Sequence, residues 1–237
     1  MHDNGWDRSA QAWIVDMGEE GDWGRRTFLD EVMLARVRAG SFRAALDVGC
    51  GEGRFCRRLQ EMGIATTGID PTEALLQQAR LRDPAGNYLN AAAERLPFAD
   101  GAFDLAISYV SLVDIEAYDA AIAEMARVLA VGGRLLVANL TSFSTARAGN
   151  GWQYDLLGRA KHFTMDRYLE PRGEWESWRG IKVRNWHRPL SDYMRAFLAQ
   201  GLVLTYFEEP APEEDGSAKA DKYRRVPWYV VMEWEKR

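Results

Sequence analysis

Three glycines at alternate positions follow an apolar segment that carries an acid. The segment reads AALDVGCGEGRF and places Asp47 just before Gly49, Gly51 and Gly53. Glycine lets the backbone turn tightly and lets a ligand approach without a Cβ atom in the way. A strand, a glycine-rich turn and a helix at the start of a parallel sheet are typical of a nucleotide site. The pattern therefore predicts a nucleotide-type cofactor at this turn.

A second acid, Asp70, ends the next apolar segment, ATTGID. A carboxylate can accept both hydroxyl protons of a ribose diol, so Asp70 is predicted to hold a ribose. The alternative interpretation is that Asp70 only caps the helix that follows it. The glycine spacing G-x-G-x-G differs from the G-x-G-x-x-G of dinucleotide-binding enzymes, which argues against a nicotinamide dehydrogenase.

The elements that must position these residues alternate along the chain. Strands are predicted at 44–48, 65–70, 87–92, 103–108 and 134–140, with helical patterns between them. This alternation predicts a parallel sheet covered on both faces. A helical stripe then precedes Gly201, and two further strands, joined by an acidic loop (208–222), are predicted to form an antiparallel edge. The segment from Thr141 to Pro189 shows no regular periodicity.

With these elements in place, the chain resembles the class I S-adenosylmethionine-dependent methyltransferases, in particular their small-molecule branch. The resemblance is carried by LDVGCGEGRF, GIDPTEALLQQAR, AAAERLPFADGAFDLAISYVSL and EMARVLAVGGRLLVANL, within residues 44–140. It implies an α/β fold, a Rossmann-like doubly wound seven-stranded sheet whose last strand is antiparallel. We expect one domain, with a cap (1–43), a cofactor-binding core (44–140), a substrate lid (141–190) and a last helix with a two-stranded edge (191–237).

The resemblance also implies the cofactor, S-adenosyl-L-methionine, the product S-adenosyl-L-homocysteine, and a set of binding residues. The methionine half is assigned to Asp47, Gly49, Cys50 and Gly51, the ribose to Asp70, the adenine to Pro71, Ala93 and Glu94, and the surroundings of the sulfonium to Ser108. Family members often carry an Asp where this chain has Ala92. Glu94 or a backbone carbonyl is expected to take its place. No metal site is predicted.

The acceptor site is expected in the lid, because in this family the segment after the fifth strand commonly covers the substrate. His187 is the candidate general base, since the reference pKa of histidine lies close to working pH. The alternative is a hydrogen-bonded structural histidine. Arg188 is expected either to bind a substrate carboxylate or to pair with the acidic loop. Tyr109, Trp152 and Trp186 are expected to contact the acceptor.

The tryptophans avoid the cofactor-binding core. None lies between residues 24 and 151, whereas four of the nine lie in the segment without periodicity. Aromatic walls suit an aromatic or a cationic acceptor, the latter through cation–π attraction. Packing of an irregular lid explains the same distribution, and an exposed aromatic insertion could equally serve a homodimer interface.

Bulk composition narrows the function. The net charge of −5 weighs against a nucleic-acid partner, no segment is long and apolar enough to span a membrane, and two cysteines indicate a reduced cytoplasmic protein. We therefore predict methyl transfer to an oxygen or nitrogen atom of a small molecule. The alternatives are an RNA or protein methyltransferase, or a module that binds S-adenosylmethionine without catalysis. The SYVS run differs from the motif of amino-methylating nucleic-acid enzymes.

Overall fold

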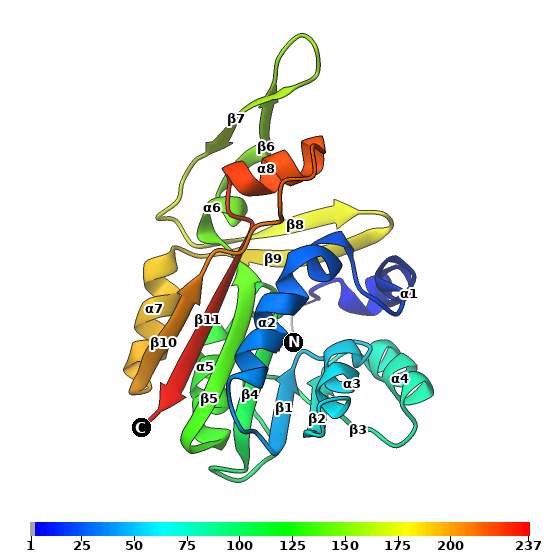
Figure 1. Ribbon diagram of the computed structural model, residues 1–237, viewed down its shortest axis with the longest axis vertical. Helices are drawn as coiled ribbons and strands as arrows, with labels where there is room; N and C mark the ends of the chain where they lie inside the picture. The colour runs from blue at the N-terminus through cyan, green and yellow to red at the C-terminus, as the bar shows by residue number, and fades with distance from the viewer. Residues whose placement is uncertain (1–2) are drawn as a thin grey trace.

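The apolar segments of the first 140 residues form the five parallel strands that the sequence predicts. The computed structural model describes residues 3–237 and places these strands in one sheet (Figure 1). They are β1 (Ala44–Val48), β2 (Ala65–Asp70), β3 (Asn87–Asn90), β4 (Phe103–Tyr109) and β5 (Leu129–Leu140). β1 is buried along nearly its whole length, as expected for a strand that is covered on both faces.

Two later strands complete a seven-stranded sheet. Its order is β3-β2-β1-β4-β5-β11-β10, in which β11 (Tyr229–Lys236) lies antiparallel to both β5 and β10 (Leu202–Glu208). The predicted sheet with an antiparallel last strand is confirmed. The predicted loop between these strands is wrong in part, because it holds a helix, α8 (Ala218–Arg225). Ser217 begins that helix by accepting a hydrogen bond from the amide of Ala220 at 3.0 Å.

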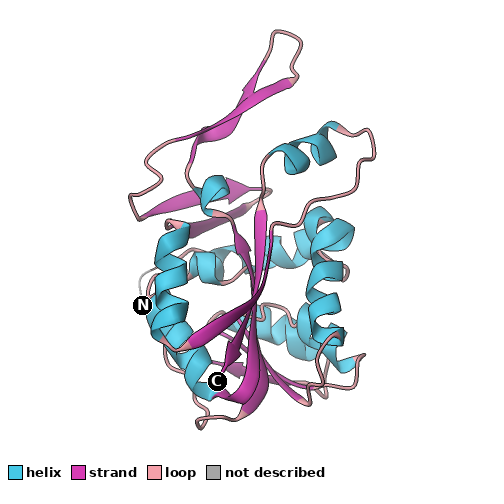
Figure 2. Cartoon of the chain, turned by 60° about the vertical axis from the view of Figure 1, so that its left-hand side comes forward, coloured by secondary structure: helices cyan, strands magenta, loops and turns pink. Residues whose placement is uncertain are grey.

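Helices cover both faces of the sheet (Figures 1 and 2), as the doubly wound prediction requires. One face packs against α2 (Asp30–Arg38) and α3 (Arg54–Gln60), beside which lies α4 (Glu73–Arg82), and the other face against α5 (Tyr118–Val128) and α7 (Leu190–Ala199). Phe197 of α7 stacks on the fully buried Trp234 of β11, with ring centroids 4.7 Å apart. Apolar burial of this kind holds α7 against the sheet.

The segment between β5 and α7, which we call the lid (141–190), forms two β-hairpins beyond the carboxyl ends of the central strands (Figure 2). A short helix, α6 (Ser142–Thr145), precedes β6 (Arg147–Tyr154), β7 (Ala160–Met165), β8 (Arg172–Trp178) and β9 (Ile181–His187). Each hairpin is a separate two-stranded sheet, and most of its side chains are only partly buried. Such strands lack regular apolar alternation, which is why the sequence does not reveal them.

The N-terminal segment is joined to the lid. It contains α1 (Trp6–Met17) and a π-helical turn, η1 (Arg25–Leu29), that leads into α2. Ser9 of α1 exchanges hydrogen bonds of 2.9 Å with both backbone groups of Lys182 in β9, and the amide of Arg184 donates to the carbonyl of Asn4 at 2.9 Å. No helix among residues 3–237 is long and apolar enough to cross a bilayer.

Candidate active site

The glycine turn after β1 has the backbone shape that only glycine adopts freely. Gly49, Gly51 and Gly53 all have positive φ angles, between 57° and 77°. A Cβ atom on Gly49 would also lie 2.4 Å from the Cβ atom of Ser111, in the loop after β4. The turn therefore packs closely against the loop after β4, and the amides of Gly49 and Cys50 both donate to the carbonyl of Ile69 in β2.

Asp70 ends β2 beside this turn. One carboxylate oxygen accepts a hydrogen bond from the amide of Gly51 at 3.0 Å, and the other accepts from the amide of Thr72, before α4, at 2.8 Å. The side chain is buried, which raises its pKa above the ordinary value. The helix-capping interpretation of Asp70 thus describes one of its contacts. Asp70 also lines a cavity.

A cavity of about 680 Å³ opens above the carboxyl ends of the strands. It is walled by the glycine turn, the ends of β2 and β4, the N-terminal segment, the β8–β9 hairpin, and the connection from α8 to β11. This volume lies within the range of small-molecule and cofactor sites. The N-terminal segment and the lid therefore close over the same sheet edge.

Eight of the predicted site residues line the cavity: Gly49, Gly51, Asp70, Pro71, Ala93, Glu94, Tyr109 and Trp186. Ala92 lines it too, so the position at which the family often has Asp faces the cavity with a methyl group. Six predicted residues lie outside the lining: Asp47, Cys50, Ser108, Trp152, His187 and Arg188.

Three of these six lie directly beneath the cavity floor. Asp47 is 1% exposed, and burial raises its pKa to about 7. Cys50 is buried in a small cluster with Cys56 and α4. The hydroxyl of Ser108 hydrogen-bonds that of Ser111 at 2.7 Å, and Ser111 is the one that lines the cavity. These residues support the floor rather than forming its surface.

His187 is placed differently from the sequence expectation. It is 2% exposed, and both ring nitrogens are engaged. Nε2 lies 2.8 Å from the carbonyl oxygen of Tyr168 and therefore donates to it, which leaves Nδ1 to accept from the hydroxyl of Thr145 at 2.8 Å. Burial lowers the pKa of this imidazole. Because neither nitrogen is available to an acceptor, the structural interpretation replaces that of a general base.

Arg188 and Trp152 also make structural contacts outside the cavity. Arg188 is 4% exposed and donates to the carbonyl oxygens of Leu112, Ile115 and Glu116, at 3.3, 2.5 and 2.9 Å. It therefore neither meets the acidic loop nor reaches the cavity, and instead fixes the turn after β4. Trp152 of β6 packs edge-to-face on Phe163 of β7, within the first hairpin of the lid.

One functional candidate escaped the sequence analysis. Asp114 ends the 3-10 turn η2 (Leu112–Asp114) and lines the cavity. Burial raises its pKa to about 8, and nearby Asp70 adds to the effect, whereas hydrogen bonds with Asn185 and Trp6 oppose it. A buried carboxyl group with a pKa near neutrality inside a cavity is a candidate for proton transfer. The acid that follows SYVSLV was the available signal.

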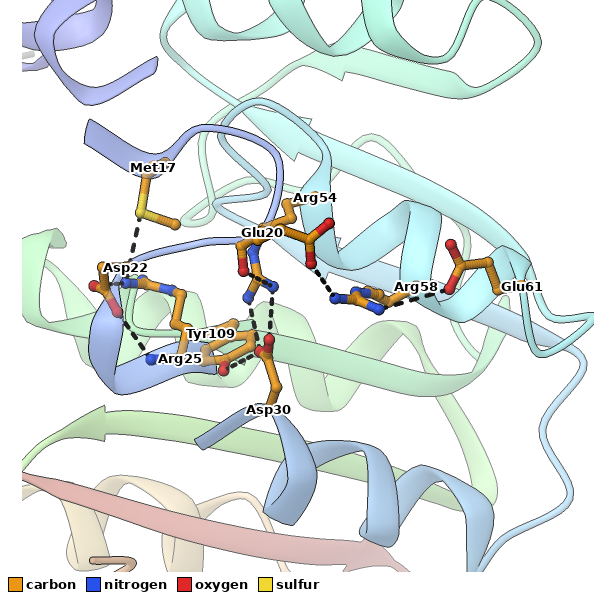
Figure 3. A network of polar contacts seen from close by, with 9 residues as sticks. All are labelled: Met17, Glu20, Asp22, Arg25, Asp30, Arg54, Arg58, Glu61 and Tyr109. Carbon is orange, nitrogen blue, oxygen red and sulfur yellow. Dashed lines mark hydrogen bonds and ion pairs between the residues drawn. The ribbon is translucent and has the colours of Figure 1, made fainter. Parts of the chain in front are cut away.

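The N-terminal segment adds a second missed group, Arg25, which lines the cavity and pairs with Asp22 at 2.6 Å. Its guanidinium lies over the ring of Tyr109, 5.3 Å from the centroid. Figure 3 shows the network behind it, in which Tyr109 donates to Asp30 at 2.6 Å and Arg54 of α3 makes two 2.7 Å bonds to the same carboxylate. The cap is thereby fixed to the helix that follows the glycine turn.

The lining suits S-adenosylmethionine. Among residues 3–237 it contains seven acidic side chains and three arginines: Asp3, Asp22, Asp70, Glu94, Asp114, Glu116 and Glu176, with Arg25, Arg147 and Arg184. An excess of acid favours a ligand with a net positive charge. Near Asp70 the wall is apolar, with Ile69, Leu75 and Ala91, as an adenine ring requires.

Comparison with known proteins identifies the family. Residues 46–137 match the family described as "Methyltransferase domain". A malonyl-[acyl-carrier protein] O-methyltransferase of Salmonella typhimurium is 30% identical over 183 residues, which cover 76% of this chain and 72% of that protein. The Erwinia pyrifoliae protein of the same name is 36% identical over 130 residues, which cover 55% of this chain. The chain spans about half the length of this relative and of several others (49%, 42% and 49%).

A solved structure shows the same architecture over most of the chain. The S-adenosylmethionine-dependent methyltransferase of Mesorhizobium loti superposes with a TM-score of 0.76 at 25% identity, covering 87% of this chain and 96% of that one. The fold, the cofactor-binding motifs and the sequence similarity lead to one conclusion: the chain belongs to the class I S-adenosylmethionine-dependent methyltransferases.

Proposed function

We propose that this enzyme methylates an oxygen atom of a small-molecule acceptor that enters beneath the lid. The observation that carries the proposal is the continuity of the cavity, which runs from Asp70, at the end of β2, past Asp114 to the lid side chains Arg147 and Trp178. One cavity can therefore hold cofactor and acceptor together. The relatives named O-methyltransferases support oxygen as the methylated atom.

The cofactor end is assigned from contacts already described. Asp70 is proposed to accept both ribose hydroxyls, with Pro71, Ala93 and Glu94 beside the adenine and the turn of Gly49 and Gly51 beside the methionine half. Bound S-adenosylmethionine supplies an electrophilic methyl group on a positively charged sulfur. The chain has then to align the acceptor, exclude water and remove its proton.

Asp114 is the proposed general base in place of His187. A hydroxyl acceptor must lose a proton as its oxygen forms the new bond to carbon, while the carbon–sulfur bond breaks with its electron pair going to sulfur. The carboxylate of Asp114 would take that proton. Its pKa of about 8 is well matched to this task near neutral pH. Asn185 of the lid holds the carboxyl group in place by a hydrogen bond.

A small acceptor agrees with the remaining properties of the chain. The net charge of −5 and the acidic cavity lining both oppose a phosphate backbone. The free cysteines Cys50 and Cys56 accord with the reducing cytoplasm, where we expect the enzyme to act.

The test is an assay with S-adenosylmethionine labelled in its methyl group. The purified protein is incubated with separate panels of phenols, alcohols, carboxylic acids and amines, and with tRNA. We expect S-adenosylhomocysteine and a labelled methyl ether or ester from at least one hydroxyl or carboxyl compound. Label only on amines or on tRNA would refute oxygen methylation. Absence of turnover by a protein that binds the cofactor would favour the non-catalytic alternative.

A further inference from the structure

Four aromatic side chains gather at the lid end of the cavity. Trp178 comes from β8, Tyr223 from α8, Tyr229 from the start of β11, and Trp228 is the residue just before that strand. The ring centroid of Tyr223 lies 5.7 Å from that of Trp228 and 6.5 Å from that of Tyr229. Together with Leu140, Arg147 and Glu176, which line the same part of the wall, we call this set the lid compartment.

The charges of the lid compartment are already balanced. Arg147 of β6 forms an ion pair with Glu176 of β8, and its guanidinium lies 5.8 Å from the ring centroid of Trp228. Farther in, Arg25 lies over the rings of Trp13 and Tyr109, at 5.4 and 5.3 Å. A cationic acceptor would therefore meet ring faces that guanidinium groups already occupy, and two positive charges beside them.

A neutral aromatic acceptor meets no such opposition. Planar rings pack favourably edge-to-face or offset against other rings, with centroids about 4.5–7 Å apart. Among residues 3–237, no arginine or lysine lies over the rings of Trp178, Tyr223 and Tyr229, whereas cations do lie over Tyr109 and Trp228. Of the two acceptor types that aromatic walls suit, the contacts thus favour the aromatic one.

We propose that the lid compartment binds an aromatic ring, so that the methyl acceptor is a phenol or a related hydroxyarene. This inference rests on the proposed function and deepens it by naming the acceptor class. It also assigns a role in specificity to Trp178 and Trp228, which the sequence analysis did not single out.

The experiment compares two ligands that differ in aromaticity. The protein is saturated with S-adenosylhomocysteine, which prevents turnover, and titrated by calorimetry with 2-naphthol and with decahydro-2-naphthol. Both probes carry one hydroxyl on two fused six-membered rings, but only the first has π faces. Because ring–ring contacts add about 0.5–1.5 kcal/mol beyond area burial, we expect 2-naphthol to bind up to about tenfold more tightly.

Two tryptophans of one strand provide a matched pair of variants. Trp178 is 37% exposed and lines the cavity, whereas Trp175 of the same strand is 45% exposed and lies outside the lining. Trp178→Leu is expected to remove most of the preference for 2-naphthol, and Trp175→Leu to retain it. Trp228→Leu provides a second test at another ring of the lid compartment. Because Trp178 and Trp175 are both partly exposed, neither substitution should prevent folding.

The outcomes separate this inference from the proposed function. Equal binding of the two probes, or binding of neither, by protein that binds S-adenosylhomocysteine would overturn the aromatic acceptor and leave the methyltransferase assignment intact. A preference for 2-naphthol that survives both Trp178→Leu and Trp228→Leu would overturn it as well. Failure of the folded protein to bind S-adenosylhomocysteine would remove the proposed function and this inference together.

Discussion

The side-chain amide of Asn185 donates a hydrogen bond of 2.5 Å to the carboxyl group of Asp114. Asn185 belongs to strand β9 of the lid, and Asp114 to the turn after β4. The side chain of Trp6 in α1 also favours the ionised form of this carboxyl group and so lowers its pKa. The carboxyl group thus lies where the lid, the cap and the sheet edge meet, and we expect its protonation to affect both the proposed proton transfer and stability.

Asp114→Asn should abolish the proton-accepting step while preserving shape. General-base catalysis typically contributes about 10²- to 10⁴-fold, so we expect a loss of that order in kcat. In the wild type, kcat/KM should rise with pH towards about 8, because the base must be ionised. The variant should lack this rise. Glu116→Gln, another acid of the lining, is the control. An unchanged pH profile in Asp114→Asn would assign the base elsewhere.

The same variant should change how stability depends on pH. In the unfolded chain Asp114 ionises near its ordinary pKa of about 3.9, whereas in the folded protein it keeps its proton up to about pH 8. Between these values the wild type loses stability as pH rises, by up to about 1.4 kcal/mol per pH unit from this group. The free energy of unfolding of Asp114→Asn, measured with urea, should therefore increase relative to that of the wild type between pH 5 and pH 8. Parallel curves would show that the carboxyl group ionises normally in the fold.

Asp70→Asn should weaken cofactor binding without unfolding the protein. The amide can still accept one backbone hydrogen bond but cannot accept protons from two hydroxyls. Loss of one charged hydrogen bond costs about 1.5–3 kcal/mol, so the Kd for S-adenosylhomocysteine should rise by about 10- to 100-fold in calorimetry. Glu73→Gln, an exposed acid at the start of α4, should bind as the wild type does. Wild-type affinity in Asp70→Asn would refute the ribose assignment.

Two arginines of α3 should differ in their effect on stability (Figure 3). Arg54 and Asp30 form a bidentate pair whose side chains are 6% and 11% exposed, whereas Arg58 pairs with Glu20 at the surface, with 33% and 70% exposed. Arg54→Met leaves a buried carboxylate unpaired and should cost about 3–5 kcal/mol. Arg58→Met should cost less than about 1 kcal/mol. Thermal unfolding measures both, and similar losses would contradict the burial argument.

His187→Phe should act on stability rather than on chemistry. It removes the donor to the Tyr168 carbonyl and the acceptor for Thr145, and an unsatisfied buried group costs about 1–3 kcal/mol. Because burial lowers the pKa of His187, the wild type should lose this contribution as pH falls below about 6.5, where the unfolded imidazole gains its proton. The pH dependence of kcat/KM should keep its shape. Loss of the rise in kcat/KM with pH in His187→Phe would restore His187 as the base.

Local sequence patterns were enough to predict those parts of the structure that residues close in sequence determine. The positive φ angles of Gly49 and Gly51, and the placement of Asp70 at a strand end, follow from short segments. The lid residues could not be assigned in this way. Whether His187 or Asp114 faces the cavity depends on how two hairpins pack against distant turns, and neither hairpin has an apolar repeat. The sequence shows a histidine at position 187 and an acid at position 114. Only the fold reveals that the acid is buried in the cavity lining and that the histidine lies outside it.

The lid leaves the sheet after β5 and returns at α7, and β10 and β11 complete the sheet beyond it. Its sequence can therefore change without altering the register of any strand that carries the glycine turn or Asp70. A change of acceptor can therefore be accommodated in this insertion, together with Tyr223, Trp228 and Tyr229 near α8 and β11, without altering the residues proposed to bind the cofactor. Lid segments exchanged between relatives are thus a route to enzymes with altered substrate range.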